Sequence, residues 1–363
     1  MKNAPILCLS LCLSILFFSC KPKKAEIDFN GTNTLSQILD KQKTNDKYLV
    51  LVLTKNGCEL CDFYKRELNQ LNKDSHPLFS SNLNIKSIAV NGNESVLNQL
   101  FRDYSFPLTV IFDKSGSIKG YFRGDRPEVL LQALKSVYSG KVFYKSKTPF
   151  LNIADTVTFS DEQKLEFVNE LFKYANIIRQ GGKLAKGQIN SLIANTRKKT
   201  YFYNNYILAK AMRNAGNTTN TSKLADSTLT IYQEELDMLL YQPLRNELRY
   251  LADDRYKTIR QPLIATPQTE INFGKEKVGS IKTIRIPVKN VGKQLLVINN
   301  VKVSCDCLKV TWPHESIPSG KTVAITVSYA LKSEGIFNQS LFVFSNSPTE
   351  PLQININGTA QII

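Results

Sequence analysis

Two close pairs of cysteines could carry thiol chemistry in this chain. Cys58 and Cys61 have two residues between them and stand between an apolar run and a segment with helical spacing. Cys305 and Cys307 have one residue between them and lie far downstream. A close pair of this kind can exchange a disulfide with a substrate, contribute to a metal site, or lock a turn. The surrounding sequence has to decide among these roles.

The first pair lies at the predicted start of a helix, a position that lowers the pKa of a thiol. The run 47–54 is typical of a buried strand, and 58–73 has an apolar face at helical spacing. A helix N-terminus offers unpaired N–H groups and a positive dipole end, which stabilise a thiolate. We therefore predict that Cys58 is exposed and nucleophilic. Cys61, one turn further along and beneath it, is predicted to attack the mixed disulfide.

The residues around the first pair argue against a metal or haem. Zinc would need further ligands, and the two histidines of the chain, His76 and His314, lack ligand spacing to this pair. Covalent haem attachment would need a histidine directly after the second cysteine, where Asp62 stands. We predict no metal and no other cofactor. A disulfide that only stabilises the fold remains the alternative to redox activity.

The N-terminal residues indicate export. A short positive segment precedes an apolar run, 6–18, which is too short to span a membrane and suits a signal peptide. The following "FFSC" resembles a bacterial lipobox, although Phe17 stands where Leu is usual. The resemblance implies cleavage before Cys20 and a lipid on that residue; ordinary secretion is the alternative. Lys21 after the cysteine implies, by the usual Gram-negative sorting pattern, the outer membrane.

The cysteine count follows from this processing. Of the seven cysteines, Cys8 and Cys12 leave with the signal and Cys20 carries lipid, so the two close pairs remain in an oxidising compartment. Two pairs cannot staple a chain of 363 residues, so apolar cores must hold its domains. The length suggests two to three domains.

The pattern of the chain predicts a multidomain fold with three structural classes in sequence. Alternating strand and helix patterns indicate an α/β domain, a capping box at Ser160–Gln163 opens a helical stretch, and short strands divided by Gly, Pro, Asn and Ser indicate a β-sandwich. The predicted domains are a signal peptide (1–19), a lipidated tether (20–33), the α/β domain (34–140), an all-α helical module (141–265) and an all-β sandwich (266–363).

Positive charge is concentrated in the helical module. The formal net charge is +16, and residues 171–225 contain no Asp or Glu but many Lys and Arg. Such a field attracts anions, and an exported protein rarely meets nucleic acid. We therefore expect no nucleic-acid partner and name anionic lipid as the partner of this segment. A solvated basic helical face is the alternative.

Residues 35–139 resemble the thioredoxin superfamily, especially its exported, membrane-tethered thiol–disulfide oxidoreductases. The resemblance rests on "CELC" at 58–61 and "SFPLTVIFDKSG" at 105–116, in the expected order. It implies a thioredoxin-like fold in which a cis-proline, Pro107, sits against the cysteines. It also implies that the backbone of Phe106 pairs with a substrate strand.

The chain departs from the thioredoxin pattern beside the cysteines. Gly57 stands where thioredoxin has a Trp, and Val52 stands where it has a buried Asp that helps deprotonate the second cysteine. Proton transfer would therefore need water or Lys55, and turnover as a reductase would be poor. Glu59 adds an anion near the thiolate and opposes the effect of the helix on Cys58.

The C-terminal residues 269–363 resemble an immunoglobulin-like domain of unknown function that is common in bacterial exported proteins and lipoproteins. The resemblance rests on "VKNVGKQLLVINNVKVSCDCLKV", "IPSGKTVAITVSY" and "GIFNQSLFVFSNS". No activity comes with it. The usual Cys-x-Cys of that family corresponds to Cys305 and Cys307, which are either bridged or two separate thiols on a strand.

Two functions are compatible with these features. The first is a lipid-anchored extracytoplasmic thiol–disulfide oxidoreductase acting on a disulfide-containing protein substrate, with Cys58, Cys61 and Pro107 as its catalytic residues. The alternative is a non-catalytic cell-envelope scaffold or binding lipoprotein with a structural CxxC disulfide. In the first case Cys305 and Cys307 are a candidate secondary redox pair that exchanges electrons with the first.

Overall fold

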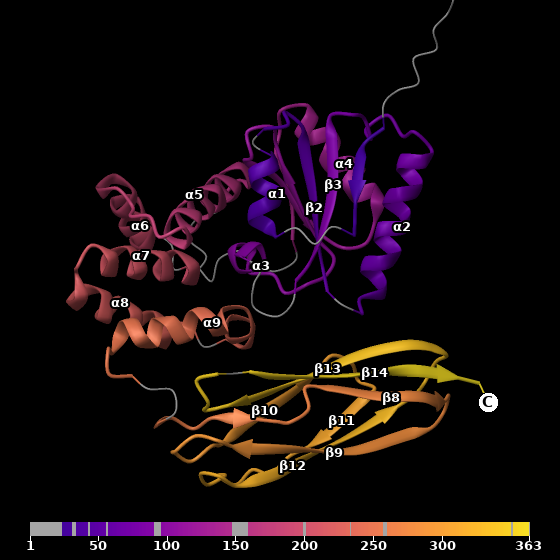
Figure 1. Cartoon of the computed structure of the whole chain (residues 1–363), viewed down its shortest axis with the longest axis vertical. Helices are drawn as coiled ribbons and strands as arrows, with labels where there is room; N and C mark the ends of the chain where they lie inside the picture. Colours follow the sequence, from indigo (N-terminus) through magenta and orange to yellow (C-terminus); the bar gives the residue numbers. More distant parts are fainter. Residues whose placement is uncertain are drawn as a thin grey trace, which may run out of the picture.

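The computed structural model describes residues 24–30, 34–42, 44–55, 57–90, 96–146, 159–198, 201–232, 234–256, 260–349 and 351–362. The predicted signal peptide and Cys20 lie outside these residues. The described chain has a mixed α/β region, a group of helices and an all-β C-terminal region, as the sequence predicts (Figure 1).

The α/β region is built on a six-stranded sheet of order β1-β3-β2-β4-β5-β6. The pairs β1–β3, β2–β3 and β5–β6 are parallel, whereas β2–β4 and β4–β5 are antiparallel. The strands are β1 (Glu26–Asp28), β2 (Tyr48–Thr54), β3 (Leu83–Ala89), β4 (Leu108–Phe112), β5 (Ile118–Arg123) and β6 (Phe143–Lys145). The helices between them are α1 (Leu35–Gln42), α2 (Glu59–Lys73), α3 (Val96–Phe101) and α4 (Pro127–Tyr138).

Two boundaries of this region differ from the sequence prediction. The lipidated tether was predicted to run to residue 33, but Glu26–Asp28 form edge strand β1 against β3. The domain was predicted to end at residue 140, but β6 adds a further strand beyond α4.

The central strands are buried on both faces. On one face, Tyr64 and Leu68 of α2 and Leu130 of α4 share a core with Val50 and Ile85. Strands that are apolar on both sides need helices on both sides. The second face therefore has to be covered as well, and α1 and α3, with 8 and 6 residues, cover little of it.

The helices after the α/β region complete the second face of its sheet. They are α5 (Asp161–Arg179), α6 (Lys186–Lys198), α7 (Phe202–Asn214), α8 (Thr218–Ile231) and α9 (Glu235–Ala252). Leu165 and Leu171 of α5 belong to the same buried cluster as Leu51 and Phe112 of the sheet. The helices of the predicted module (141–265) therefore share one core with the α/β region.

The C-terminal region consists of two facing four-stranded sheets, β10-β13-β14-β8 and β11-β12-β9-β7. Its strands are β7 (Ile264–Ala265), β8 (Glu270–Lys277), β9 (Ile281–Asn290), β10 (Ile298–Val303), β11 (Leu308–Thr311), β12 (Thr322–Ala330), β13 (Gly335–Ser345) and β14 (Leu352–Gln361). Alternate residues of the strands, such as Leu341 and Val343, fill the core between the sheets. The predicted β-sandwich is thus present.

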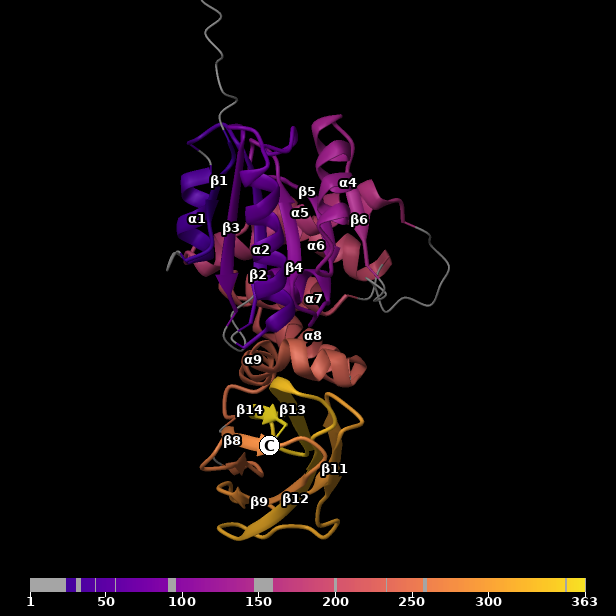
Figure 2. The same ribbon diagram turned by 90° about the vertical axis from the view of Figure 1, so that its right-hand side faces the viewer.

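The sandwich lies against the end of the α/β sheet at which β2 leads into α2 (Figures 1 and 2). Its sheet β10-β13-β14-β8 faces the α/β region, and Arg249 of α9 donates a hydrogen bond to the carbonyl of Pro348 (2.8 Å). Within the described ranges no helix has the length and apolar character that crossing a membrane requires.

Candidate functional site

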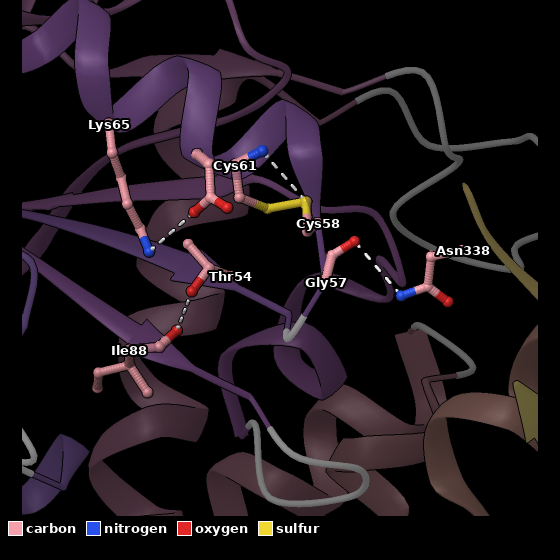
Figure 3. The surroundings of a disulfide bond; sticks show 8 residues. Thr54, Gly57, Cys58, Cys61, Lys65, Ile88 and Asn338 are labelled. Carbon is pink, nitrogen blue, oxygen red and sulfur yellow. Dashed lines mark hydrogen bonds and ion pairs between the residues drawn. A yellow bond between two sulfur atoms is a disulfide. The ribbon is translucent and has the colours of Figure 1, made fainter. Parts of the chain in front are cut away.

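The first cysteine pair forms a disulfide at the start of α2 (Figure 3). Cys58 is the N-cap residue of the helix, and its Sγ accepts a hydrogen bond from the backbone N–H of Cys61 (3.2 Å). Cys58 is half-exposed, whereas Cys61 is 1% exposed beneath it. Only Cys58 can therefore be reached from solvent without movement of the helix.

Pro107 opens β4 at the same edge of the sheet. The Phe106–Pro107 peptide bond is cis, and the carbonyl of Pro107 accepts a hydrogen bond from the N–H of Gly124 (3.2 Å). Strands β2 and β4 are neighbours, with Leu53 opposite Leu108. Because β2 runs on into the Cys58 loop and β4 begins just after Pro107, the Cys58 loop and Pro107 lie at the same end of these two strands.

An ionisable side chain, Lys55, lies at the end of β2. It is half-buried, and burial lowers the pKa of its ammonium group, an effect that the Glu270 carboxylate opposes. Val52, on the same strand, is fully buried in the core. Lys55 thus lies between the cysteine loop and the sandwich, near Glu270 of β8.

The sandwich contacts the cysteine loop directly. Asn338 of β13 donates a side-chain hydrogen bond to the carbonyl of Gly57 (3.3 Å; Figure 3). Gly57 has a φ of 69°, and a Cβ at this position would lie 2.3 Å from Nδ2 of Asn338. Glycine is therefore required here both for the backbone conformation and for the close approach of the sandwich.

A second contact joins the sandwich to the loop before Pro107. Tyr104 donates a hydrogen bond from its hydroxyl to Oε1 of Gln353 on β14 (3.0 Å). The ring of Tyr104 also meets the ring of Phe342 edge to face, with centroids 6.2 Å apart. Sequence reasoning missed Asn338 and Gln353, because nothing in the local pattern of β13 or β14 reports a contact with residues so far away.

A cavity of about 680 Å³ separates the two regions beside these contacts. On the α/β side it is lined by Lys55, Gly57, Tyr104 and Phe106. On the side of the sandwich, its lining includes Glu270, Ile336, Asn338, Gln353, Asn355 and Asn357. The predicted substrate-contacting residue, Phe106, therefore faces a cleft whose second wall comes from the sandwich.

The second cysteine pair, Cys305 and Cys307, is bridged as well. It occupies the turn in which the chain leaves β10 in one sheet and enters β11 in the other. Both residues are half-buried and pack against the core of the sandwich. The preceding residue, Ser304, donates a backbone hydrogen bond to the carbonyl of Ser340 (2.9 Å), which places the turn beside β13, the strand that contacts Gly57.

The acid-free segment 171–225 is only partly neutralised. Lys210 pairs with Glu247 of α9 (2.6 Å), and Arg213 pairs with Asp254. Other basic side chains in the segment are exposed, namely Lys173, Arg179, Lys183, Lys186 and Lys223. In the described part of the chain, no cluster of His, Cys, Asp and Glu is grouped as a metal site would require.

A protein-family comparison matches the sandwich. Residues 264–360 match the family described as protein of unknown function (DUF1573). No curated protein matches the chain. Similar solved structures include a protein of unknown function from Porphyromonas gingivalis W83, with 13% identity, a TM-score of 0.26, and coverage of 30% of this chain and 50% of that one. The chain thus spans half the length of the Porphyromonas protein.

PapD-like domain 7 of human CEP192 is similar at 8% identity and a TM-score of 0.27, over 30% of this chain and 92% of that one. The secreted serine protease VesC from Vibrio cholerae is similar at 15% identity and a TM-score of 0.24, over 28% of this chain and 24% of that one. At these scores the similarities support no conclusion about function.

Proposed function

We propose that the chain is a lipid-anchored extracytoplasmic thiol–disulfide oxidoreductase whose α/β region is a thioredoxin-like domain. The observation that carries this proposal is the placement of Cys58. It caps α2, is half-exposed, and is bridged to a buried Cys61. The position of Pro107 directly before β4, the strand next to β2, adds support, since the thioredoxin resemblance implies a proline there.

The proposed reaction transfers two electrons through a mixed disulfide. In the reduced enzyme, the Cys58 thiolate attacks one sulfur of a substrate disulfide, and the other substrate sulfur leaves as a thiolate and takes up a proton. The Cys61 thiol then loses its proton and attacks Sγ of Cys58. The Cys58–Cys61 bond forms, the mixed disulfide breaks, and the substrate leaves with both thiols reduced. Substrate oxidation is the reverse sequence.

The N-terminus of α2 and Lys55 have separate roles in this reaction. The hydrogen bond from the Cys61 N–H to Sγ of Cys58 is the kind of contact that stabilises a thiolate at a helix start. Lys55 can accept the proton of Cys61 when its amine is neutral, and burial lowers the pKa of Lys55 in that direction. Water in the cleft can serve in its place.

Alkylation tests the proposed division of roles between Cys58 and Cys61. After mild reduction, iodoacetamide at neutral pH should label Cys58 at least about tenfold faster than Cys61, because only Cys58 is both accessible and at the helix N-terminus. Mass spectrometry of peptides separates the two labels from those on Cys305 and Cys307. Equal and slow labelling of Cys58 and Cys61 would favour the alternative, a scaffold with a structural disulfide.

We propose that a lipid on Cys20 anchors the chain to the outer membrane of a Gram-negative cell. The lipobox-like "FFSC" supports this, and Lys21 supports the outer membrane. Cys20→Ser should move the protein from the membrane to the soluble fraction. If the Cys20→Ser protein stays on the membrane and high salt then releases it, the anchor is instead anionic lipid bound at the exposed basic residues of 171–225.

We also propose Cys305 and Cys307 as a secondary redox pair. Their disulfide is half-buried in a turn beside β13, and β13 also contacts the loop of Cys58. In the exchange, the Cys58 thiolate attacks one sulfur of this disulfide and the other leaves as a thiolate. Cys61 then closes the Cys58–Cys61 bond and releases the second thiolate. Electrons thus pass from one pair to the other without a further reductant.

A further inference from the structure

The sandwich occupies space beside Cys58 that a side chain at position 57 would otherwise use. A Cβ on Gly57 would point at the amide of Asn338, 2.3 Å away (Figure 3). Asn338 instead holds the carbonyl of Gly57, the residue directly before the reactive cysteine. The surface that faces the cysteine loop is therefore made by the sandwich. We call it the wall; it consists of Asn338 on β13 and of Gln353, Asn355 and Asn357 on β14.

The face that β13 and β14 turn toward the cysteine loop is rich in carboxamides. Inward residues of β14, such as Ile354 and Ile356, fill the core, so Gln353, Asn355 and Asn357 lie on the outer face. Asn357 pairs with Asn338 across the two strands. A carboxamide both donates and accepts hydrogen bonds, as does a peptide backbone. The wall can therefore pair with either kind of backbone group.

Part of this wall is fixed, and part of it is free to bind. Gln353 accepts a hydrogen bond from Tyr104 and donates one to Asn355 (2.8 Å), and Asn355 donates one to Glu270. Asn357 is half-buried and lines the cavity, and its side-chain carboxamide has no hydrogen-bond partner among the residues that the structure describes. It is thus the carboxamide of the wall that remains available to a ligand.

The other residues that line the cavity indicate which class of ligand it can bind. Ile336 is 68% exposed although it lines the cavity, and Phe106 lies on the opposite wall. Lys55 and Glu270 bring one basic and one acidic side chain to the same cavity, so it does not favour an anion. Apolar contacts on two sides, with carboxamides between them, suit an extended uncharged polypeptide better than a glycan or an anionic lipid.

On this basis, and resting on the proposed oxidoreductase function, we propose that the sandwich is the second wall of the substrate site. An extended, uncharged polypeptide segment lies in the cleft between Phe106 and β13–β14. The amide of Asn357 pairs with its backbone, and an apolar side chain next to the substrate cysteine packs against Ile336. The sandwich thereby selects which disulfides reach Cys58.

The activities on a small disulfide and on a peptide disulfide are compared, because only the peptide can contact the sandwich while both report the thiol chemistry. The small disulfide is bis(2-hydroxyethyl) disulfide, which is too small to span the cleft. The peptide disulfide is a short uncharged peptide with a leucine beside a cysteine that is disulfide-linked to 2-mercaptoethanol. Ile336→Glu in the full chain should lower the ratio of kcat/KM for the peptide to that for the small disulfide about tenfold, because it places a charge against an apolar side chain. Asn357→Ala should lower the same ratio.

Ile281→Glu is the matched control, because Ile281 is 70% exposed on β9 in the other sheet of the sandwich. It should leave the ratio unchanged. If Ile336→Glu changes the ratio no more than Ile281→Glu does, the sandwich is not a wall of the substrate site, even though the dithiol is active.

A binding measurement covers the case in which the dithiol proves inactive. A fluorescently labelled peptide of the same sequence, with its cysteine replaced by serine, is titrated with the Cys58→Ser/Cys61→Ser variant. Binding that Ile336→Glu weakens and Ile281→Glu does not would support the cleft as a peptide site on its own. Absence of binding would overturn the inference, whatever the outcome for redox activity.

Discussion

Cys58→Ser is expected to remove disulfide exchange, lowering its rate about 100-fold or more, because a serine hydroxyl cannot replace the thiolate as nucleophile at neutral pH. Cys61→Ala should behave differently. It leaves the half-exposed Cys58 at the N-cap of α2 but removes the buried thiol that we propose resolves the mixed disulfide. The Cys61→Ala protein should therefore accumulate a covalent complex through Cys58, visible on a non-reducing gel.

The partner that is disulfide-linked to Cys58 in that complex shows whether the two cysteine pairs of this chain exchange electrons. A Cys58 peptide linked to Cys305 or Cys307 would support exchange between the two pairs of this chain. A complex with foreign proteins alone would leave Cys305–Cys307 as a local support of the β10–β11 turn. The matched control is Cys58→Ser/Cys61→Ala, which should trap nothing. If that control still traps the same complexes, Cys58 is not the nucleophile.

The second large effect concerns the junction of the α/β region with α9. Arg102 follows α3 and donates a hydrogen bond from Nε to Oδ1 of Asp237 (2.7 Å), and it also pairs with Glu234. The side chains of Arg102 and Asp237 are 4% and 0% exposed. Asp237→Ala would leave a buried guanidinium without its main counter-charge, which costs about 3–5 kcal/mol of the free energy of unfolding.

The α/β region and the helices α5–α9 form one folded unit of about 150–250 residues. For a unit of this size, that loss corresponds to a fall in Tm of about 6–20 °C, measured by circular dichroism or calorimetry. Asp254→Ala is the matched control, because Asp254 pairs with Arg213 while 64% exposed, and such surface pairs contribute about 1 kcal/mol or less. Equal effects of the two substitutions would contradict the account. So would two separate transitions of which only the helical one moves, since a shared core should unfold as one unit.

The parts of the fold that could be predicted are those with a strong local pattern. The run 47–54 and the amphipathic 58–73 became β2 and α2, because burial of apolar side chains at periods of two and 3.6 is already visible in the residues themselves. The strands β1 and β6 have three residues each, too few to show a period. Strand β8 has no clear strand pattern, since "EINFGKEK" is polar, carries Gly274 and lies at the edge of its sheet.

The candidate site was predicted only where it depends on local sequence. The positions of Cys58 at the start of α2 and of the cis bond before Pro107 follow from short motifs. The contact of Asn338 with Gly57 joins residues 281 positions apart, and a single sequence carries no signal for it. The glycine at position 57 is explained by its positive φ and by the close approach of the sandwich.

The most direct test of the central claim, that Cys58–Cys61 is a redox-active pair, is its reduction potential. The full chain is equilibrated in glutathione buffers of graded ratio, free thiols are alkylated, and the Cys58 and Cys61 peptides are quantified by mass spectrometry. We predict a midpoint between about −270 and −120 mV, the range of thiol–disulfide oxidoreductases. A midpoint below about −300 mV, typical of structural disulfides in exported proteins, would contradict the account.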